Sequence, residues 1–255
     1  MSSFPPPSLR DLSDQVQFET GSVLTGIGII APFDFALDRE YWDWIPANVS
    51  LHVTRTPFLD QQVGVAMAEQ LSEDKVLMAA ARELIIADPA VTVFACTSGS
   101  FVHGLAGEER CRQAILAGGA RRALTTRGAL VEALSALAIR RIAVVTPYDA
   151  STTTRLVEFL DEAGFGTTSC SFLGLKGDIF RVSPVTVYRL VRAADCEDAE
   201  AIFISCTNLR TREVISTLEH ELGKVVLSAN QVTIWAALKA AGVKVEVPDQ
   251  RLFAI

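Results

Sequence analysis

Two short segments of the sequence combine a cysteine with neighbours suited to chemistry on a small acid. The apolar run in "VFACTSGSF" (93–101) ends at Cys96, and the run in "IFISCTN" (202–208) ends in the same way at Cys206. Hydroxyl, amide and backbone N–H groups bind a carboxylate or a developing oxyanion. The residues that could supply them are Thr97 and Ser98 after the first thiol, and Thr207 and Asn208 after the second.

A pair of thiols that face one substrate from opposite sides would explain this repetition. One thiol could attack the substrate or remove a proton, and the other could deliver a proton to the opposite face. This chemistry needs neither a metal nor an organic cofactor. A thiol between a strand and a helix lies near backbone N–H groups and a positive helix terminus, which lower its pKa. We therefore predict that Cys96 and Cys206 are catalytic and have lowered pKa values.

The other three cysteines fit a packing role. Cys111, Cys170 and Cys196 have no such neighbours, and a lone cysteine on an apolar element is usually a small buried hydrophobic side chain. Five cysteines are an odd number, and none is paired in CxxC spacing. This pattern argues against a disulfide framework and a structural zinc site, and it favours a reducing, cytoplasmic setting.

Two further side chains are candidates for binding the substrate. Tyr148, in "VVTPYDAS", follows an apolar run, and its phenol could donate a hydrogen bond to a carboxylate or enolate. Asp34, in "APFDFALD", occupies the matching loop of the first half, where it could act in the site or cap a helix. His103 and Arg55 could orient a thiol or pair with a carboxylate, but no surrounding pattern supports either.

Short β-rich runs alternate with helical patterns along the chain. Such alternation is typical of an α/β fold with parallel sheets covered on both faces by helices. The expected strands are 22–32, 49–57, 91–98, 122–126, 141–148, 166–173, 200–207 and 224–230. The expected helices are 61–87, 107–117, 128–138, 152–163, 184–194, 211–222 and 231–241.

The two halves of the chain match each other. Pro32 in "GIIAPF" and Pro147 in "AVVTPY" lie 115 residues apart, and Cys96 and Cys206 lie 110 residues apart. A repeat of this length predicts two pseudo-symmetric lobes, each a mainly parallel sheet flanked by helices. Ligands bind beyond the carboxyl ends of parallel strands, which predicts an active site between the lobes. The expected boundaries are an N-terminal arm 1–21, a first lobe 22–139, a second lobe 140–230 and a final helical segment 231–255 able to pack on the first lobe.

Composition excludes several classes of partner. Of 255 residues, 49% are hydrophobic and 21% are charged, and a net charge of −7 offers no basic surface for nucleic acid or an anionic membrane. The apolar stretches are shorter than a membrane span, and residues 1–15 show no signal-peptide pattern. We expect a cytoplasmic protein whose partner is a small carboxylic acid.

Four segments resemble the aspartate/glutamate racemase superfamily, in particular the maleate cis-trans isomerases and the arylmalonate decarboxylases. They are "FACTSGSF", "VVTPY", "FISCTNLR" and "LGKVVLSANQVTIWAAL". The resemblance runs from about Gly26 to Gly242, and it implies two pseudo-symmetric lobes, a homodimer or homotetramer, and cofactor-free chemistry. It implies that Cys96 is a nucleophile or base and Cys206 an acid/base, and that one cysteine adds to a double bond so that the carbon–carbon bond can rotate. The implied carboxylate ligands are Thr97, Ser98, Tyr148, Thr207 and Asn208.

The sequence departs from the isomerase pattern at two positions. Asp34 stands where the isomerases usually have an asparagine that binds a carboxylate, and Thr153 lies near a second position that often holds asparagine. An ionised Asp34 repels a dianion unless it is protonated or paired, and Phe33 and Phe35 favour a ligand more apolar than maleate. The decarboxylases have glycine at the first cysteine position, so Cys96 favours isomerase or racemase chemistry.

Three functions remain open at this point. The first, which we favour, is a cofactor-independent isomerase, maleate isomerase-like or racemase-like, acting on a small carboxylic or dicarboxylic acid. The second is an arylmalonate-type decarboxylase in which Cys206 donates a proton to an enediolate. The third is a non-catalytic protein that binds a small acid on the same scaffold.

Overall fold

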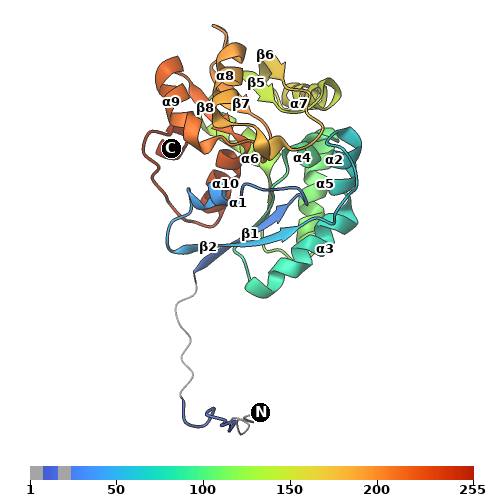
Figure 1. The fold of residues 1–255 in the computed structure, drawn as a ribbon, viewed down its shortest axis with the longest axis vertical. Coiled ribbons are helices and arrows are strands. Elements are labelled where there is room, and N and C mark those ends of the chain that lie inside the picture. Colours follow the sequence, from blue (N-terminus) through green and yellow to red (C-terminus); the bar gives the residue numbers. More distant parts are fainter. Residues whose placement is uncertain (1–7, 17–23) are drawn as a thin grey trace, which may run out of the picture.

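The computed structural model describes residues 8–16 and 24–255 and contains two four-stranded sheets (Figure 1). The strand order is β2-β1-β3-β4 in the first sheet and β6-β5-β7-β8 in the second, and all neighbouring strands are parallel. The strands are β1 (Thr25–Ala31), β2 (Val49–Arg55), β3 (Val91–Phe94), β4 (Ala123–Thr125), β5 (Arg141–Thr146), β6 (Gly166–Phe172), β7 (Ala201–Ile204) and β8 (Val225–Ser228). The two sheets repeat one topology, which confirms the predicted pseudo-symmetric α/β fold.

Helices connect successive strands and cover the sheets. They are α1 (Asp38–Trp42), α2 (Val65–Leu71), α3 (Asp74–Leu84), α4 (Thr97–Phe101), α5 (Gly104–Ala117), α6 (Thr126–Ala136), α7 (Ala150–Glu162), α8 (Pro184–Ala194), α9 (Arg212–Leu222) and α10 (Ala229–Ala240), with short 3₁₀ turns η1 (Ile85–Ala87), η2 (Ile179–Arg181) and η3 (Arg251–Ala254). Several begin where a side chain accepts a hydrogen bond from the N–H three residues later. Thr125, Asp149, Ser183 and Ser228 do this for α6, α7, α8 and α10.

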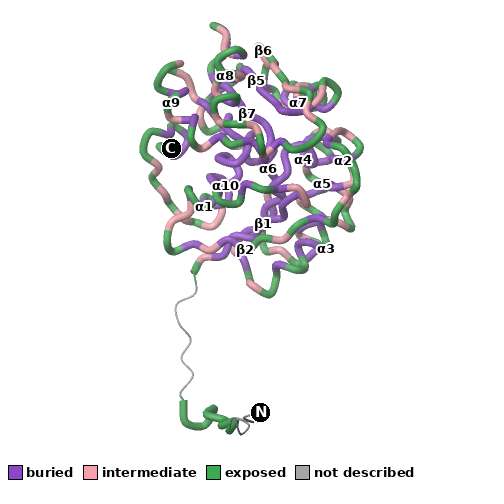
Figure 2. Tube along the Cα trace, viewed as in Figure 1, coloured by how far each residue is buried: buried purple, intermediate pink, exposed green. Residues whose placement is uncertain are grey.

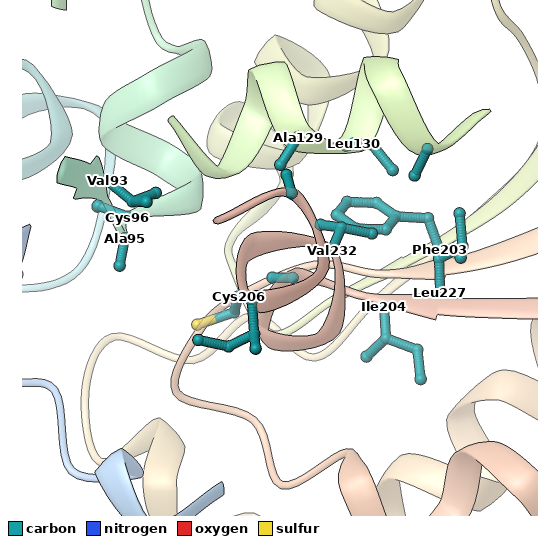
Figure 3. Packing of buried hydrophobic residues seen from close by; sticks show 14 of the residues in the cluster. Val93, Ala95, Cys96, Ala129, Leu130, Phe203, Ile204, Cys206, Leu227 and Val232 are labelled. Carbon is teal, nitrogen blue, oxygen red and sulfur yellow. The ribbon is translucent and has the colours of Figure 1, made fainter. Parts of the chain in front are cut away.

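The core lies between the sheets and their helices (Figure 2). Every residue of β3 and β7 is buried, as expected for central parallel strands covered on both faces. Helix α10 packs against α6 and β3, and Val232 of α10 lies in the same buried cluster as Phe203 and Leu130 (Figure 3). The last helix therefore contacts the first sheet.

The structure corrects several expected boundaries. The expected helix 61–87 is divided into α2, α3 and η1, because the Ser72 hydroxyl turns back onto the carbonyl of Glu69 at the end of α2. The expected helical segment 231–255 is α-helical only to Ala240, since Gly242 adopts a φ of +73° and ends the helix, and the short 3₁₀ turn η3 follows near the C-terminus. The expected arm 1–21 and the start of the expected strand 22–32 fall mostly outside the described residues.

Cys170 is a further correction. It was expected to be buried, but it is exposed, because β6 is the edge strand of the second sheet and is covered less completely than β5 or β7. Cys196 is only half-buried, whereas Cys111 is buried in α5 as expected. All five cysteines are free thiols.

Candidate active site

The carboxyl ends of β1, β3, β5 and β7 surround one small cavity. Its volume is about 20 Å³, which is room for about one water molecule. The residues that line it are Pro32, Asp34, Val63, Met67, Cys96, Thr97, Ser98, Tyr148, Ile179, Cys206, Thr207 and Asn208. The structure thus brings together all eight residues selected from the sequence, four from each half of the chain.

Cys96 lies at the start of α4, directly after β3. Its side chain is 3% exposed, and its Sγ accepts a hydrogen bond of 3.4 Å from the N–H of Gly99 and lies 3.8 Å from Ser98 Oγ. A Cβ atom at Gly99 would lie 2.8 Å from the ring of Phe94 and 3.2 Å from Cys96 Sγ. Glycine is therefore required for the N–H to approach the thiol this closely.

Cys206 follows β7 on a strained turn. Its φ is +96°, a conformation that non-glycine residues adopt rarely and that costs on the order of 1–3 kcal/mol. Its Sγ accepts a hydrogen bond of 3.3 Å from the N–H of Asn208, and the nearby Tyr148 hydroxyl, which accepts one of 3.5 Å from Ser205 Oγ, lowers the pKa of the thiol. Backbone strain of this kind persists only where surrounding contacts hold it.

Burial has the largest effect on the pKa values of both thiols. It raises the pKa of Cys96 to about 11 and that of Cys206 to about 12, although the N–H groups of Gly99 and Asn208 lower both values. The expected lowering of these pKa values was therefore wrong. Helix α4 has only one turn, and α9 begins six residues after Cys206, so neither helix terminus offsets the loss of solvation.

Asp34 is half-buried in the loop after β1. Burial raises the pKa of its carboxyl, whereas the positive charge of Arg55 and a hydrogen bond from Asn208 lower it. The Arg55 guanidinium itself bonds to the carbonyls of Phe33 and Phe35 and does not line the cavity. Among the described residues, none of the lysine, arginine or histidine side chains lines the cavity, so Asp34 is the charged group closest to a ligand there.

The hydroxyl and amide groups that line the cavity differ in whether they already have a hydrogen-bond partner in the protein. Thr97 Oγ1 is buried and has no partner among the described residues, so it is available to a ligand. The side chain of Asn208 is already engaged: its Nδ2 donates to the carbonyl of Asp34 and its Oδ1 accepts from the N–H of Ala36, both at 2.9 Å. Asn208 therefore connects the loop that contains Asp34 to the loop that contains Cys206.

The cavity also has apolar walls that the sequence did not reveal. Val63, Met67 and Ile179 line it, and the N–H of Val63 donates to the carbonyl of Lys176 at 2.9 Å, which joins the segment after β2 to the second half. In a single sequence, such residues are indistinguishable from ordinary core side chains. His103, in contrast, is an exposed residue before α5 and lies outside the cavity.

Larger hollows lie elsewhere on the surface, beside the C-terminal segment. One of about 620 Å³ is bordered by residues such as Glu219, His220 and Asp249, away from the strand ends that carry the thiols. In residues 8–16 and 24–255, no group of three or more His, Cys, Asp or Glu side chains is placed to hold a metal ion. The helices of this described part are also too short or too polar to cross a membrane.

Sequence comparison relates the chain to two kinds of enzyme. A family model described as arylmalonate decarboxylase matches residues 46–253. The arylmalonate decarboxylase of Bordetella bronchiseptica is 30% identical over 205 residues, which cover 78% of this chain and 85% of that protein. A maleate isomerase of Nocardia farcinica is 32% identical over 174 residues, which cover 65% of this chain and 69% of that protein.

Solved structures of the same two kinds of enzyme also match this chain. A liganded double mutant of arylmalonate decarboxylase matches with a TM-score of 0.82 and 28% identity, covering 90% of this chain and 98% of that one. A mutant of the Nocardia farcinica maleate cis-trans isomerase, which holds a covalently bound succinylcysteine intermediate, shares the fold with a TM-score of 0.80 and 24% identity, covering 90% and 98%. Since the family model spans most of the chain and the decarboxylase relative is matched along most of its length, this protein belongs to the arylmalonate decarboxylase family, whose relatives include maleate isomerases.

Proposed function

We propose that this protein is a cofactor-independent isomerase that acts on a small carboxylic acid through Cys96 and Cys206. The observation that carries the proposal is the meeting of two thiols, one from each sheet, at a single cavity that also presents hydroxyl groups. The decarboxylase relatives are expected to have glycine at the position of Cys96, so the retained thiol favours isomerisation. A reducing, cytoplasmic setting suits the proposal, because both reactive groups are free thiols.

In the proposed cis-trans isomerisation, Cys96 is the nucleophile and Cys206 is the acid. Cys96 first loses its proton to solvent, since a pKa of about 11 keeps the resting thiol protonated. The thiolate then adds to one carbon of the double bond and the Cys206 thiol protonates the other carbon. Rotation about the resulting single bond follows. Cys206 then takes a proton back from that carbon, the carbon–sulfur bond breaks, and the trans acid and the Cys96 thiolate are released. In a racemisation, one thiolate removes the α-proton and the opposite thiol supplies another.

The groups around the thiols bind the carboxylate. We infer that Thr97 Oγ1, which has no protein partner among the described residues, donates to it together with the hydroxyls of Ser98 and Thr207. The Tyr148 phenol remains protonated, because burial raises its pKa well above the usual value, and so it serves as a donor.

Decarboxylation is the second candidate, and the family model and the Bordetella relative favour it. In this reaction a malonate loses carbon dioxide, and the electron pair left behind forms an enediolate. Cys206 then donates its proton to the carbon of the enediolate. Only Cys206 is needed, so the two functions differ in their dependence on Cys96.

Single cysteine variants separate these functions. Maleate, phenylmalonate and a set of small chiral acids are incubated in deuterated buffer with Cys96→Ala, Cys206→Ala and the wild-type protein, and the products are read by NMR. We expect each variant to lose isomerase turnover by roughly 100-fold or more while the circular dichroism spectrum is unchanged.

The control is Cys111→Ala, which removes a buried thiol outside the cavity and should retain turnover. Decarboxylation that survives Cys96→Ala but not Cys206→Ala would support the second candidate. Isomerase activity that survives in both single variants would defeat the two-thiol proposal.

A further inference from the structure

A buried carboxylate in the segment that follows β1, outside the cavity lining, has no part in the reaction proposed above. Glu40, in α1, is 8% exposed, and it accepts hydrogen bonds from the N–H of Thr211 at 3.2 Å and the N–H of Arg212 at 3.1 Å. The hydroxyl of Thr211 donates to the same carboxylate. Burial raises the pKa of Glu40, and these hydrogen bonds lower it. A buried carboxylate is tolerated where donors replace water in this way.

Glu40 accepts hydrogen bonds from two N–H groups at the start of α9, that of Thr211 just before the helix and that of Arg212 at its first position. The opening turn of a helix leaves N–H groups without partners inside the helix, and the preceding residue usually accepts one of them. Thr211 precedes α9 but makes no such bond, because its hydroxyl is directed to Glu40. The carboxylate, 171 residues away in the chain, instead accepts from the N–H groups of Thr211 and Arg212, and its negative charge is favourable at this end of a helix.

The loop between Cys206 and α9 is consequently held at both ends by one segment of the first half. Near its start, Asn208 bonds to the backbone of Asp34 and Ala36. At its end, Glu40 binds the backbone of Thr211. The strained turn at Cys206 lies within five residues of this second attachment, and strain is retained only where such contacts enforce it.

We propose that Glu40 is a positioning residue, whose carboxylate fixes the α9 end of this loop and thereby keeps the Cys206 thiol directed into the cavity. The contacts of Glu40 alone support this effect on the orientation of the Cys206 thiol. Its consequence for turnover rests on the proposed function.

Glu219 offers a matched control. It is 3% exposed, burial raises the pKa of its carboxyl, and it accepts hydrogen bonds of 3.0 Å from the N–H groups of Val226 and Arg251. It thus makes the same kind of contact as Glu40 but lies at the hollow beside the C-terminal segment, outside the thiol cavity. A purely structural effect of losing a buried carboxylate should be similar at both positions.

The test compares Glu40→Gln, Glu40→Asp and Glu219→Gln by alkylation of the folded proteins with iodoacetamide. Mass spectrometry gives the rates at Cys206 and Cys96 in the same sample, so their ratio cancels differences in reagent and pH. We expect Glu40→Gln to raise this ratio about fivefold or more, because the released loop exposes Cys206. Glu40→Asp, which keeps the charge, should show a smaller rise, and Glu219→Gln should match the wild-type ratio.

Activity provides a second readout wherever a substrate has been found. For Glu40→Gln we expect kcat to fall about tenfold with little change in KM, since the reacting thiol is displaced and the carboxylate-binding groups are not. If Glu40→Gln does not fold, Glu40→Asp replaces it with the same expected direction. A folded Glu40 variant with the wild-type alkylation ratio, or an equal rise in Glu219→Gln, would overturn the inference. Because alkylation needs no substrate, its outcome is independent of whether the protein is an isomerase.

Discussion

At the scale of single residues, the described side chains that line the cavity include no cation, and this sets the charge balance of the site. Asp34 is the ionisable carboxyl among the described lining residues, and its charge raises the pKa of both thiols. The same charge acts on any ligand. A dianion would meet this carboxylate, and the Arg55 guanidinium, whose charge lowers the pKa of Asp34, binds backbone carbonyls and does not line the cavity.

Replacing Asp34 should therefore widen the range of substrates. We expect Asp34→Asn to use maleate better than the wild-type protein, with KM lowered about tenfold, because a like charge becomes a hydrogen-bond donor. Initial rates with maleate over a range of concentrations provide the measurement. Asp38→Asn removes an exposed carboxylate from the same segment outside the cavity and should leave KM unchanged. Unchanged or poorer use of maleate by Asp34→Asn would show that Asp34 has another role.

At the scale of elements, the short helix α4 is fitted closely to the strand before it. Gly99 allows the backbone of α4 to approach Phe94 of β3 and the thiol of Cys96, and each of these side chains is almost fully buried. Buried side chains have little room to move, so an added methyl group cannot be accommodated without displacement.

We expect Gly99→Ala to lower the free energy of unfolding by about 1–3 kcal/mol, the usual cost of overpacking a core. It should also reduce turnover, since the methyl group displaces Cys96 Sγ. Urea unfolding and rate measurements test both effects. Gly177→Ala is the control, because a Cβ atom there meets nothing within 4 Å, and its stability should change by less than about 0.5 kcal/mol. Equal stability of the two variants would contradict the close fit.

The strands could be predicted from the sequence, whereas the two shortest helices could not. The strands were located because buried parallel strands are short apolar runs, and the polar residues after them marked the cavity. Helices α1 and α4 were not predicted, because five residues carry too little periodicity to be recognised. Glu40 was missed for a related reason: its partners lie 171 residues away, and nothing in its local sequence indicates them.

At the scale of the whole molecule, the repeated strand order explains why two similar segments meet. Strands β3 and β7 hold equivalent positions in their sheets, so Cys96 and Cys206 emerge at equivalent ends. The repeat could be predicted from the sequence because the corresponding segments follow one another at similar spacing in both halves of the chain. The division of the chain at residues 139 and 140 stays a prediction, as do the roles given to individual site residues. The thiol pKa values could not be predicted, since they depend on burial by the complete fold.

Burial of the two thiols links global stability to pH. In the folded protein their pKa values are about 11 and 12, above the value of 9.0 for a free thiol, so the unfolded chain loses these protons first. The contribution to stability is present in full below about pH 9 and is lost as the pH rises toward the folded values. The expected slope is at most about 1.4 kcal/mol per pH unit for each thiol.

Urea unfolding at about pH 8, 9 and 10 tests this linkage. The wild-type protein should lose stability more steeply with pH than the double variant Cys96→Ala/Cys206→Ala, which lacks both groups. Cys111 has a pKa of about 12 and is retained in both proteins, so its contribution cancels. Equal pH slopes in the two proteins would show that these thiols do not titrate differently on folding.

The small size of the cavity has a kinetic consequence. A molecule of four or more carbon atoms cannot occupy the space of about one water until Val63, Met67 or Ile179 moves aside. Association should therefore be slower than diffusional encounter, and its observed rate should level off at high ligand concentration, where displacement of these apolar side chains becomes limiting. Packed around the bound ligand, the same apolar side chains shield a carbanion from protonation by bulk solvent.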